Sequence, residues 1–268
     1  MPQSAGPVDP PQSLTREDGS VLAYYKTQAG KARAEGTKAL PGLIFLGGFM
    51  SDMSGTKAVA LEDYARREGR DFLRFDYRGH GQSSGRFEDG TIGDWAGDAL
   101  AALDELTEGP QILVGSSMGG WIALLVARAR PQRIAGLIGI APAPDFTEDL
   151  IWGRATPEQR AALESAGYVD RPSEYSAEPY RITYRLIEEG RDHLLLNAPI
   201  PITCPLRLIH GMQDVDVPWQ TSLRLAEAVE SDDVEVILVK SAAHRLSEPE
   251  DLERLERVIE DVSAKAAG

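Results

Sequence analysis

The fold is decided by the stretch Gln111-Ile112-Leu113-Val114-Gly115-Ser116-Ser117-Met118-Gly119-Gly120-Trp121. Apolar residues typical of a buried strand run into a G-x-S-x-G pattern, and an apolar helix follows. In this context the pattern predicts a sharp turn that lifts the Ser117 hydroxyl clear of the sheet, where it can act as a nucleophile. Gly115 and Gly119 lack Cβ atoms, which would let the strand and the helix approach closely.

The position of this turn before a helix also indicates an oxyanion hole. It directs the N-terminus of the following helix toward a reacting carbonyl, where free N–H groups and the helix dipole stabilise developing negative charge. We expect one donor to be the backbone N–H of Met118, directly after the serine. The second is expected from Phe49, in the loop Gly47-Gly48-Phe49 after the third strand. The alternatives are an ordinary Gly/Ser loop around Ser117 and a plain tight turn at Gly47-Gly48.

Length and composition indicate one large α/β protein. The chain has 268 residues, enough to bury a sizeable core without disulfides. Its one cysteine, Cys204, excludes an intramolecular disulfide, is compatible with a reducing compartment and is expected to be a small core residue. With 28 basic and 42 acidic residues the net charge is −14, which argues against binding to nucleic acids or anionic membranes. No apolar run approaches the roughly 18 residues of a membrane span.

Strands and helices are expected to alternate along most of the chain. Residues 1–12 carry four prolines and no apolar segment, so we expect a flexible tail rather than a signal peptide. Residues 13–144 and 202–268 predict an α/β core, a mostly parallel sheet of about eight strands flanked by helices. The last helix is expected to begin at Ser247, with Glu250 at capping-box spacing.

Residues 145–201 interrupt the alternation. They contain no good strand and several short helical patterns, which predicts a small helical cap inserted after the sixth strand; a surface excursion is the alternative. Aromatic side chains of the cap could form an apolar pocket for an acyl chain, although ordinary packing would also explain each of them, and its arginines could meet a substrate carboxylate. These residues are Trp152, Tyr168, Tyr175, Tyr180 and Tyr184, with Arg154, Arg181 and Arg185.

A nucleophilic serine needs a base, and a histidine suits that task. In a chain with this elbow the order is nucleophile, acid, base. Of the four histidines only His244 follows the last strand, so we expect it to be the base. His210 closes a strand with little freedom to reach Ser117, and His193 lies in the cap. His80 belongs to the segment Arg78–Gly85, which we interpret as a structural turn that supports the elbow from beneath.

The acid is expected in the loop His210–Pro218, which follows the preceding strand and offers two aspartates. Its carboxylate would hold the imidazole in the tautomer that leaves Nε2 free for the serine. Asp214 is the expected acid, and Asp216 is expected to be a turn residue before Val217-Pro218. The predicted catalytic residues are therefore Ser117, Asp214 and His244.

With these residues assembled, the chain resembles the α/β-hydrolase superfamily from about Ser13 onward. Within it the resemblance is greatest to the mitochondrial α/β-hydrolase-domain proteins that act as palmitoyl-protein thioesterase and mycophenolic acid acyl-glucuronide esterase. The stretches that carry it are Gly55-Thr56-Lys57-Ala58, Arg74-Phe75-Asp76-Tyr77, Gly109 to Trp121, Pro172-Ser173-Glu174-Tyr175-Ser176, Ile209-His210-Gly211-Met212-Gln213-Asp214 and Val217-Pro218-Trp219.

The resemblance implies a hydrolase of carboxylic esters or thioesters that needs no cofactor and no metal, with Ser117, Asp214 and His244 matching the triad. The resemblance also implies its partners, a small acyl ester or thioester or an S-acylated protein. A C–C bond hydrolase with the same triad and a non-catalytic ligand-binding protein on this fold remain alternatives. The chain lacks an Arg-rich presequence, unlike these relatives, so we expect a cytoplasmic location.

Overall fold

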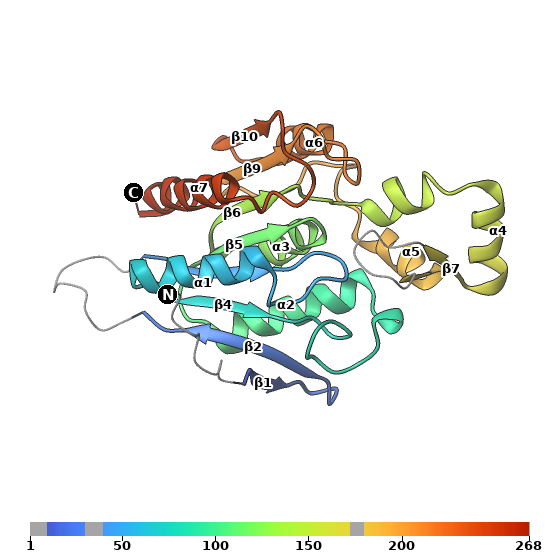
Figure 1. Ribbon diagram of the computed structural model, residues 1–268, viewed down its shortest axis with the longest axis horizontal. Coiled ribbons are helices and arrows are strands. Elements are labelled where there is room, and N and C mark those ends of the chain that lie inside the picture. The colour runs from blue at the N-terminus through green and yellow to red at the C-terminus, as the bar shows by residue number, and fades with distance from the viewer. Residues whose placement is uncertain (1–9, 30–39, 172–179, 268) are drawn as a thin grey trace, which may run out of the picture.

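The computed structural model describes residues 10–29, 40–171 and 180–267, and its centre is an eight-stranded sheet (Figure 1). The strand order is β1-β2-β4-β3-β5-β6-β9-β10. β2 pairs antiparallel with β1 and with β4, and all other neighbours are parallel. The predicted α/β fold with about eight mostly parallel strands is therefore confirmed. The strands are β1 Gln12–Thr15, β2 Val21–Thr27, β3 Gly42–Leu46, β4 Phe72–Phe75, β5 Gln111–Ser116, β6 Ile134–Ile140, β9 Leu206–Gly211 and β10 Val234–Val239.

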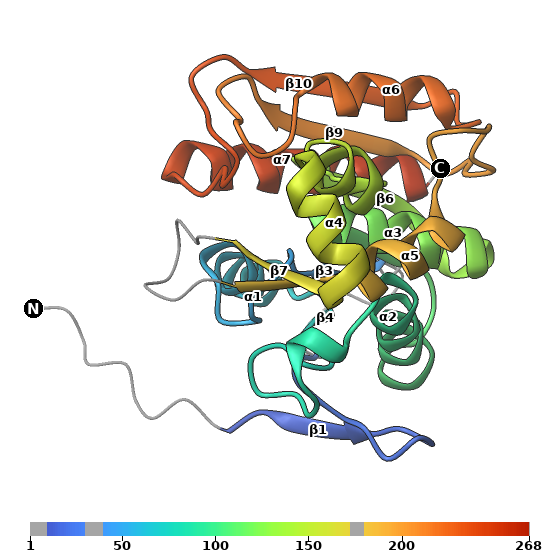
Figure 2. The ribbon, with the colours of Figure 1, turned by 90° about the vertical axis from the view of Figure 1, so that its right-hand side faces the viewer.

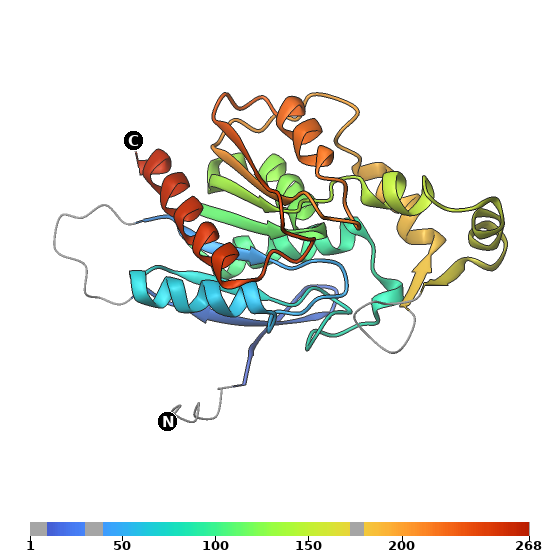
Figure 3. The ribbon, with the colours of Figure 1, turned by 45° about the horizontal axis from the view of Figure 1, so that its top comes forward.

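Helices cover both faces of the sheet (Figure 3). Side chains of β3 alternate between the faces: Leu43 belongs to the core cluster that includes residues of α1 and α7, and Ile44 belongs to the cluster that includes residues of α2, α3 and α6. This two-sided burial explains why the parallel strands are continuous apolar runs. The helices are α1 Thr56–Glu68, α2 Ile92–Leu106, α3 Met118–Ala129, α6 Gln220–Ala228 and α7 Pro249–Ala267, with short 3₁₀ turns η1 Phe87–Asp89 and η2 Pro131–Arg133.

The start of α7 differs from the prediction. The helix begins at Pro249, not at Ser247, and the predicted capping box between Ser247 and Glu250 is wrong. Instead the Asp251 carboxylate accepts a hydrogen bond from the N–H of Glu248 at 3.3 Å. Proline is favoured at the first helical position because it has no N–H to leave unpaired, and this moves the helix start.

Between β6 and β9 the chain leaves the sheet. The intervening elements lie together beyond one end of it, and in Figure 2 they face the viewer (Figures 1 and 2). The expectation that this segment holds no strand is wrong, because β7 and β8 form a two-stranded antiparallel sheet. Each strand has four residues and is mostly half-exposed, too short for a periodic pattern to reveal. The elements are η3 Thr147–Trp152, α4 Pro157–Ala166, β7 Tyr168–Arg171, β8 Tyr180–Thr183, α5 Tyr184–Gly190 and η4 Arg191–His193.

A buried carboxylate joins the beginning and the end of this inserted segment. Asp145 is 2 % exposed and has a left-handed backbone with φ of 59°. Its two carboxylate oxygens accept hydrogen bonds from the N–H groups of Leu195 and Leu196, at 2.8 Å each.

Within the described residues, none of the helices combines the length and apolarity that crossing a membrane requires.

Candidate active site

Ser117 lies at the turn between β5 and α3, as the G-x-S-x-G pattern predicts. Its backbone has φ of 54° and ψ of −118°, a strained conformation for a residue with a side chain. The turn is held by a hydrogen bond from the Ser117 N–H to the Ile140 carbonyl, at 2.9 Å. A Cβ on Gly115 would lie 2.3 Å from the Gly119 carbonyl oxygen, so strand and helix could not approach this closely with a larger residue.

The loop after β10 brings His244 to the serine. His244 Nε2 lies 3.1 Å from the Ser117 hydroxyl, and His244 Nδ1 lies 2.7 Å from Oδ2 of Asp214. The three side chains expected from the sequence therefore form one continuous hydrogen-bonded chain. The Asp214 side chain is fully buried and that of His244 is 19 % exposed, so the imidazole forms the boundary between the interior and the site.

The Asp214 carboxylate is ionised and fixed. Burial alone would raise its pKa, but hydrogen bonds from His210 and His244 and the nearby imidazole charge lower that pKa well below its usual value. Its other oxygen, Oδ1, accepts the N–H groups of Asp216 and Val217 at 2.9 and 2.8 Å. Asp216 thus contributes its backbone to the turn that holds Asp214.

His210 supports the site in a way that the sequence reasoning missed. It is fully buried, and its Nε2 lies 3.1 Å from both Asp214 Oδ2 and the Val217 carbonyl oxygen. Since both partners only accept, Nε2 must carry a proton, and Nδ1 lies 2.8 Å from the Ser222 hydroxyl oxygen. The i, i+4 spacing of His210 and Asp214 across the strand end was the available signal.

A metal ion would compete with these hydrogen bonds. Within the described residues, Asp214, Asp216 and His244 can bring ligand atoms within 4.8 Å of one another. However, the Asp214 Oδ2 atom already accepts from His210 and His244. The geometry suits a proton relay better than a metal centre.

The loop after β3 lies directly against the elbow. A Cβ on Gly119 would lie 2.0 Å from the Leu46 carbonyl oxygen, and one on Gly48 would lie 3.5 Å from the Ser117 Cβ. This close approach brings the loop that contains Phe49 beside the nucleophile. Met118 is the first residue of α3, and the first N–H groups of a helix have no partner within it.

The segment Arg78–Gly85 supports the loop after β3 rather than the elbow, which corrects the interpretation from the sequence. His80 Nε2 accepts the Met50 N–H at 3.3 Å, and the Asp76 carboxylate accepts the Met53 N–H at 2.7 Å. Burial raises the pKa of Asp76, against hydrogen bonds that lower it. A cavity of about 130 Å³ lies between the two loops, lined by Met50, Ser51, Asp52, Gly79, His80, Gly81 and Phe87.

Aromatic rings surround Phe49. Its ring centroid lies 4.8 Å from Phe87, 5.9 Å from Trp95, 5.5 Å from Phe146 and 6.2 Å from Tyr180, all edge to face. These contacts form an apolar cluster on the loop whose Gly48 lies against Ser117.

Of the aromatic residues expected to line an acyl pocket, Tyr180 is the one with a ring contact to Phe49. Trp152 packs against Tyr184, and Tyr168 lies under the Arg181 guanidinium at 3.6 Å. Tyr175 and the stretch Pro172–Ser176 lie outside the described residues, as do most of the tail and residues 30–39.

The three arginines of the inserted segment that were expected to meet a substrate are engaged with protein groups. Arg181 pairs with Asp170 at 2.9 Å, Arg185 lies 3.8 Å from Asp94, and Arg154 donates to the Asp216 carbonyl oxygen at 3.2 Å. Arg154 therefore lies nearest the loop that holds Asp214.

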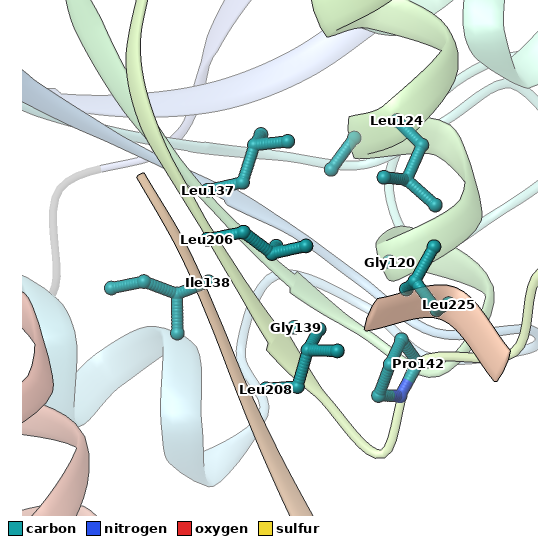
Figure 4. A pocket seen from close by; sticks show the side chains of 10 residues that line it. Gly120, Leu124, Leu137, Ile138, Gly139, Pro142, Leu206, Leu208 and Leu225 are labelled. Atoms are coloured by element: carbon teal, nitrogen blue, oxygen red, sulfur yellow. The ribbon is translucent and has the colours of Figure 1, made fainter. Parts of the chain in front are cut away.

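An apolar cavity lies behind the elbow (Figure 4). It is lined by Gly120 and Leu124 of α3 and by Leu137, Leu206 and Leu225 among others, and its volume of about 10 Å³ holds at most one water molecule. It is too small for an acyl chain.

A comparison with protein families agrees with this geometry, because the model of the alpha/beta hydrolase family matches residues 43–258. The chain belongs to the alpha/beta hydrolase family. This hydrolase resembles bovine mitochondrial palmitoyl-protein thioesterase ABHD10, with 44% identity over 94% of this chain and 79% of the relative. The mouse relative is 47% identical over 94% of this chain and 82% of its own.

Solved structures give the same assignment. The hydrolase superposes on the mouse alpha/beta hydrolase domain-containing protein 10 with a TM-score of 0.85 and 42% identity, covering 95% of this chain and 98% of that one. A putative hydrolase from Agrobacterium vitis S4 gives a TM-score of 0.88 and 40% identity, with coverage of 96% and 100%.

The names of the relatives correct one expectation. The bovine, orangutan, human and mouse proteins are all named as mitochondrial. The cytoplasmic location expected from the sequence is therefore wrong. That expectation depended on the composition of the residues at the start of the chain.

Proposed function

We propose that this hydrolase cleaves acyl thioesters and carboxylic esters, with Ser117 as the nucleophile, His244 as the base and Asp214 as the residue that orients His244. One observation carries the proposal: the unbroken hydrogen-bonded chain from the Ser117 hydroxyl through both nitrogens of His244 to Asp214. This is the geometry in which an imidazole can take a hydroxyl proton while its other nitrogen is held by a carboxylate.

In the proposed reaction Ser117 Oγ attacks the acyl carbonyl and its proton passes to His244 Nε2. The negative charge on the carbonyl oxygen is stabilised by the N–H groups of Phe49 and Met118. The C–S or C–O bond then breaks, and His244 returns the proton to the departing thiol or alcohol. Water attacks the acyl-serine by the same route, with His244 again as the base, and releases the carboxylic acid and the free serine.

The proposed substrate is an acyl chain linked to a thiol, including an S-acylated cysteine of a protein. Two facts support it: the relatives are named palmitoyl-protein thioesterases, and the rings around Phe49 form an apolar cluster on the loop that lies against Ser117. We further propose that residues 145–201 form a cap that selects the acyl group, mounted on a core of residues 13–144 and 202–268.

The test is labelling with a fluorophosphonate, together with hydrolysis of p-nitrophenyl esters and of acyl thioesters of increasing chain length. We expect the wild type to be labelled and active, and Ser117→Ala to be neither. Ser116→Ala is the matched control, one residue earlier at the same turn, and should keep the label. Labelling that survives in Ser117→Ala would place the nucleophile elsewhere.

An ester-binding measurement and a diketone substrate, added to this experiment, separate the two alternative functions. A non-catalytic binding protein would retain esters without turning them over, and a C–C bond hydrolase would cleave a diketone faster than a thioester. Neither outcome is compatible with the proposed reaction.

A further inference from the structure

His80 is a buried histidine that the proposed reaction does not use. It is 4 % exposed and lies among the rings of Tyr77, Phe87 and Trp95, with ring centroids 5.2–5.7 Å away. Both of its ring nitrogens nevertheless have polar partners. Nδ1 lies 3.2 Å from the Arg78 carbonyl oxygen, and Nε2 lies 3.3 Å from the Met50 backbone nitrogen.

These partners determine the protonation state of the ring. A carbonyl oxygen can only accept, so Nδ1 must carry a proton, and a backbone N–H can only donate, so Nε2 must present its lone pair. The neutral Nδ1–H tautomer is the one state that satisfies both. Burial lowers the pKa of His80, against the Arg78 carbonyl and the charge of Asp98, which raise it.

The Met50 N–H that His80 accepts belongs to the peptide that follows Phe49. Met50 has φ of 57°, a left-handed conformation that is unfavourable for a residue with a long side chain. A backbone in this region is kept there only by several contacts, of which the hydrogen bond from the Ser51 N–H to the Gly48 carbonyl oxygen, at 3.1 Å, is one. The hydrogen bond to His80 is such a contact, and it fixes the plane of the peptide next to the proposed oxyanion donor.

We infer that His80 is a positioning residue, which orients the Phe49 N–H toward the oxyanion by accepting the Met50 N–H. The inference deepens the proposed function and depends on it. The loop is anchored at two points by one neighbouring segment, because Asp76 holds the Met53 N–H three residues further on. Asp76 fixes the far end of the loop, and His80 fixes the end beside Ser117.

The first test compares two variants of nearly equal size, His80→Gln and His80→Met. Glutamine offers an amide oxygen near the position of Nε2, whereas the methionine sulfur is a weak acceptor. Losing an oxyanion donor costs about 10²- to 10³-fold in kcat, so a misoriented donor should cost about 10- to 100-fold in the Met variant. KM should stay unchanged, and the Gln variant should keep kcat within about threefold of the wild type.

The second test uses the cavity of about 130 Å³ beside His80. In His80→Ala the vacated space opens into this cavity, so added imidazole should restore the acceptor and raise kcat at least tenfold. His193→Ala is the matched control, a partly buried histidine whose ring pairs with Glu189 at 2.8 Å. It should show no gain with imidazole.

Two results would overturn the inference: a Met variant with wild-type kcat, or equal losses in the Gln and Met variants together with no rescue of the Ala variant. Failure of the proposed function looks different. In that case the wild type itself would neither take the fluorophosphonate label nor hydrolyse esters.

Discussion

The Nε2 atom of His210 lies 3.1 Å from Oδ2 of Asp214, the same oxygen atom that accepts the Nδ1–H of His244. The carboxylate therefore serves two histidines, one fully buried and one facing the site. His210 holds the Asp214 carboxylate from the buried side, while in the proposed reaction His244 takes the proton of Ser117.

Replacing His210 by phenylalanine should separate these roles. The variant keeps the ring volume but leaves Oδ2 and the Val217 carbonyl without the buried donor, so the free energy of unfolding should fall by about 1–3 kcal/mol. It should also reduce kcat, by less than loss of Asp214 does. Urea denaturation and steady-state kinetics measure both effects. Ser222→Ala is the control, since it leaves the Nε2 donor in place, and a larger loss of kcat there would contradict the assignment.

The choice between the two aspartates of the loop can be tested by neutralising each one. Asp214→Asn should lower kcat by about 10⁴-fold, because an amide no longer holds His244 in the required tautomer. Asp216→Asn should stay within about threefold, since it keeps the backbone N–H that Asp216 donates to the Asp214 carboxylate. Hydrolysis of a p-nitrophenyl ester measures both. The reverse ranking would make Asp216 the acid.

The Lys57 ammonium group should make the free energy of unfolding depend on pH in the alkaline range. This ammonium group donates to the Arg245 carbonyl and to the Ser247 hydroxyl, which follow His244 in the same loop. Burial and the nearby Arg245 lower the pKa of Lys57 from 10.5 to about 8, although Asp251 opposes the shift. Between these two pH values the unfolded chain binds more protons than the native one, so this group makes unfolding less favourable as pH rises.

The expected result is a difference between variants. From pH 7 to 9.5 the urea midpoint of the wild type should rise relative to that of Lys57→Met, which has no such proton to lose. Lys240→Met, at an exposed position, is the control and should follow the wild type. Parallel curves for wild type and Lys57→Met would show that Lys57 does not titrate in this range.

Asp145 should control how firmly the inserted segment is attached. Asp145→Asn tolerates the same left-handed backbone but retains only one carbonyl acceptor for the N–H groups of Leu195 and Leu196. We expect the free energy of unfolding to fall by about 1–3 kcal/mol, and amide hydrogen exchange at these two residues to become faster. Asp149→Asn, which breaks only an exposed pair with Arg224, should leave exchange at Leu195 unchanged.

Much of the fold followed from local patterns. The apolar run before Ser117, the glycines around it and the order of the last strands are properties of neighbouring residues, and they predicted both the sheet and the candidate triad. Gly69 ends α1 in a left-handed conformation, at the position where glycine is favoured after a helix. Such features are encoded within a few residues.

The features that escaped prediction depend on contacts between distant segments. His80 meets Met50 across 30 residues, and Asp145 meets Leu195 across 50. Neither pair has a signature in the spacing of apolar residues, because a carboxylate or an imidazole can satisfy backbone groups anywhere it is folded against them. The short strands β7 and β8 stabilise each other, and neither is recognisable alone.

The insertion between β6 and β9 divides the chain between its proposed reacting groups. Ser117 precedes it, and Asp214 and His244 follow it, while β6 and β9 lie side by side as parallel neighbours. A cut in the exposed turn at Gly153–Arg154 would leave the nucleophile on one fragment and the acid and base on the other. Turnover would then require the two fragments to reassemble by pairing β6 with β9. This arrangement makes the chain a candidate for a split-enzyme sensor.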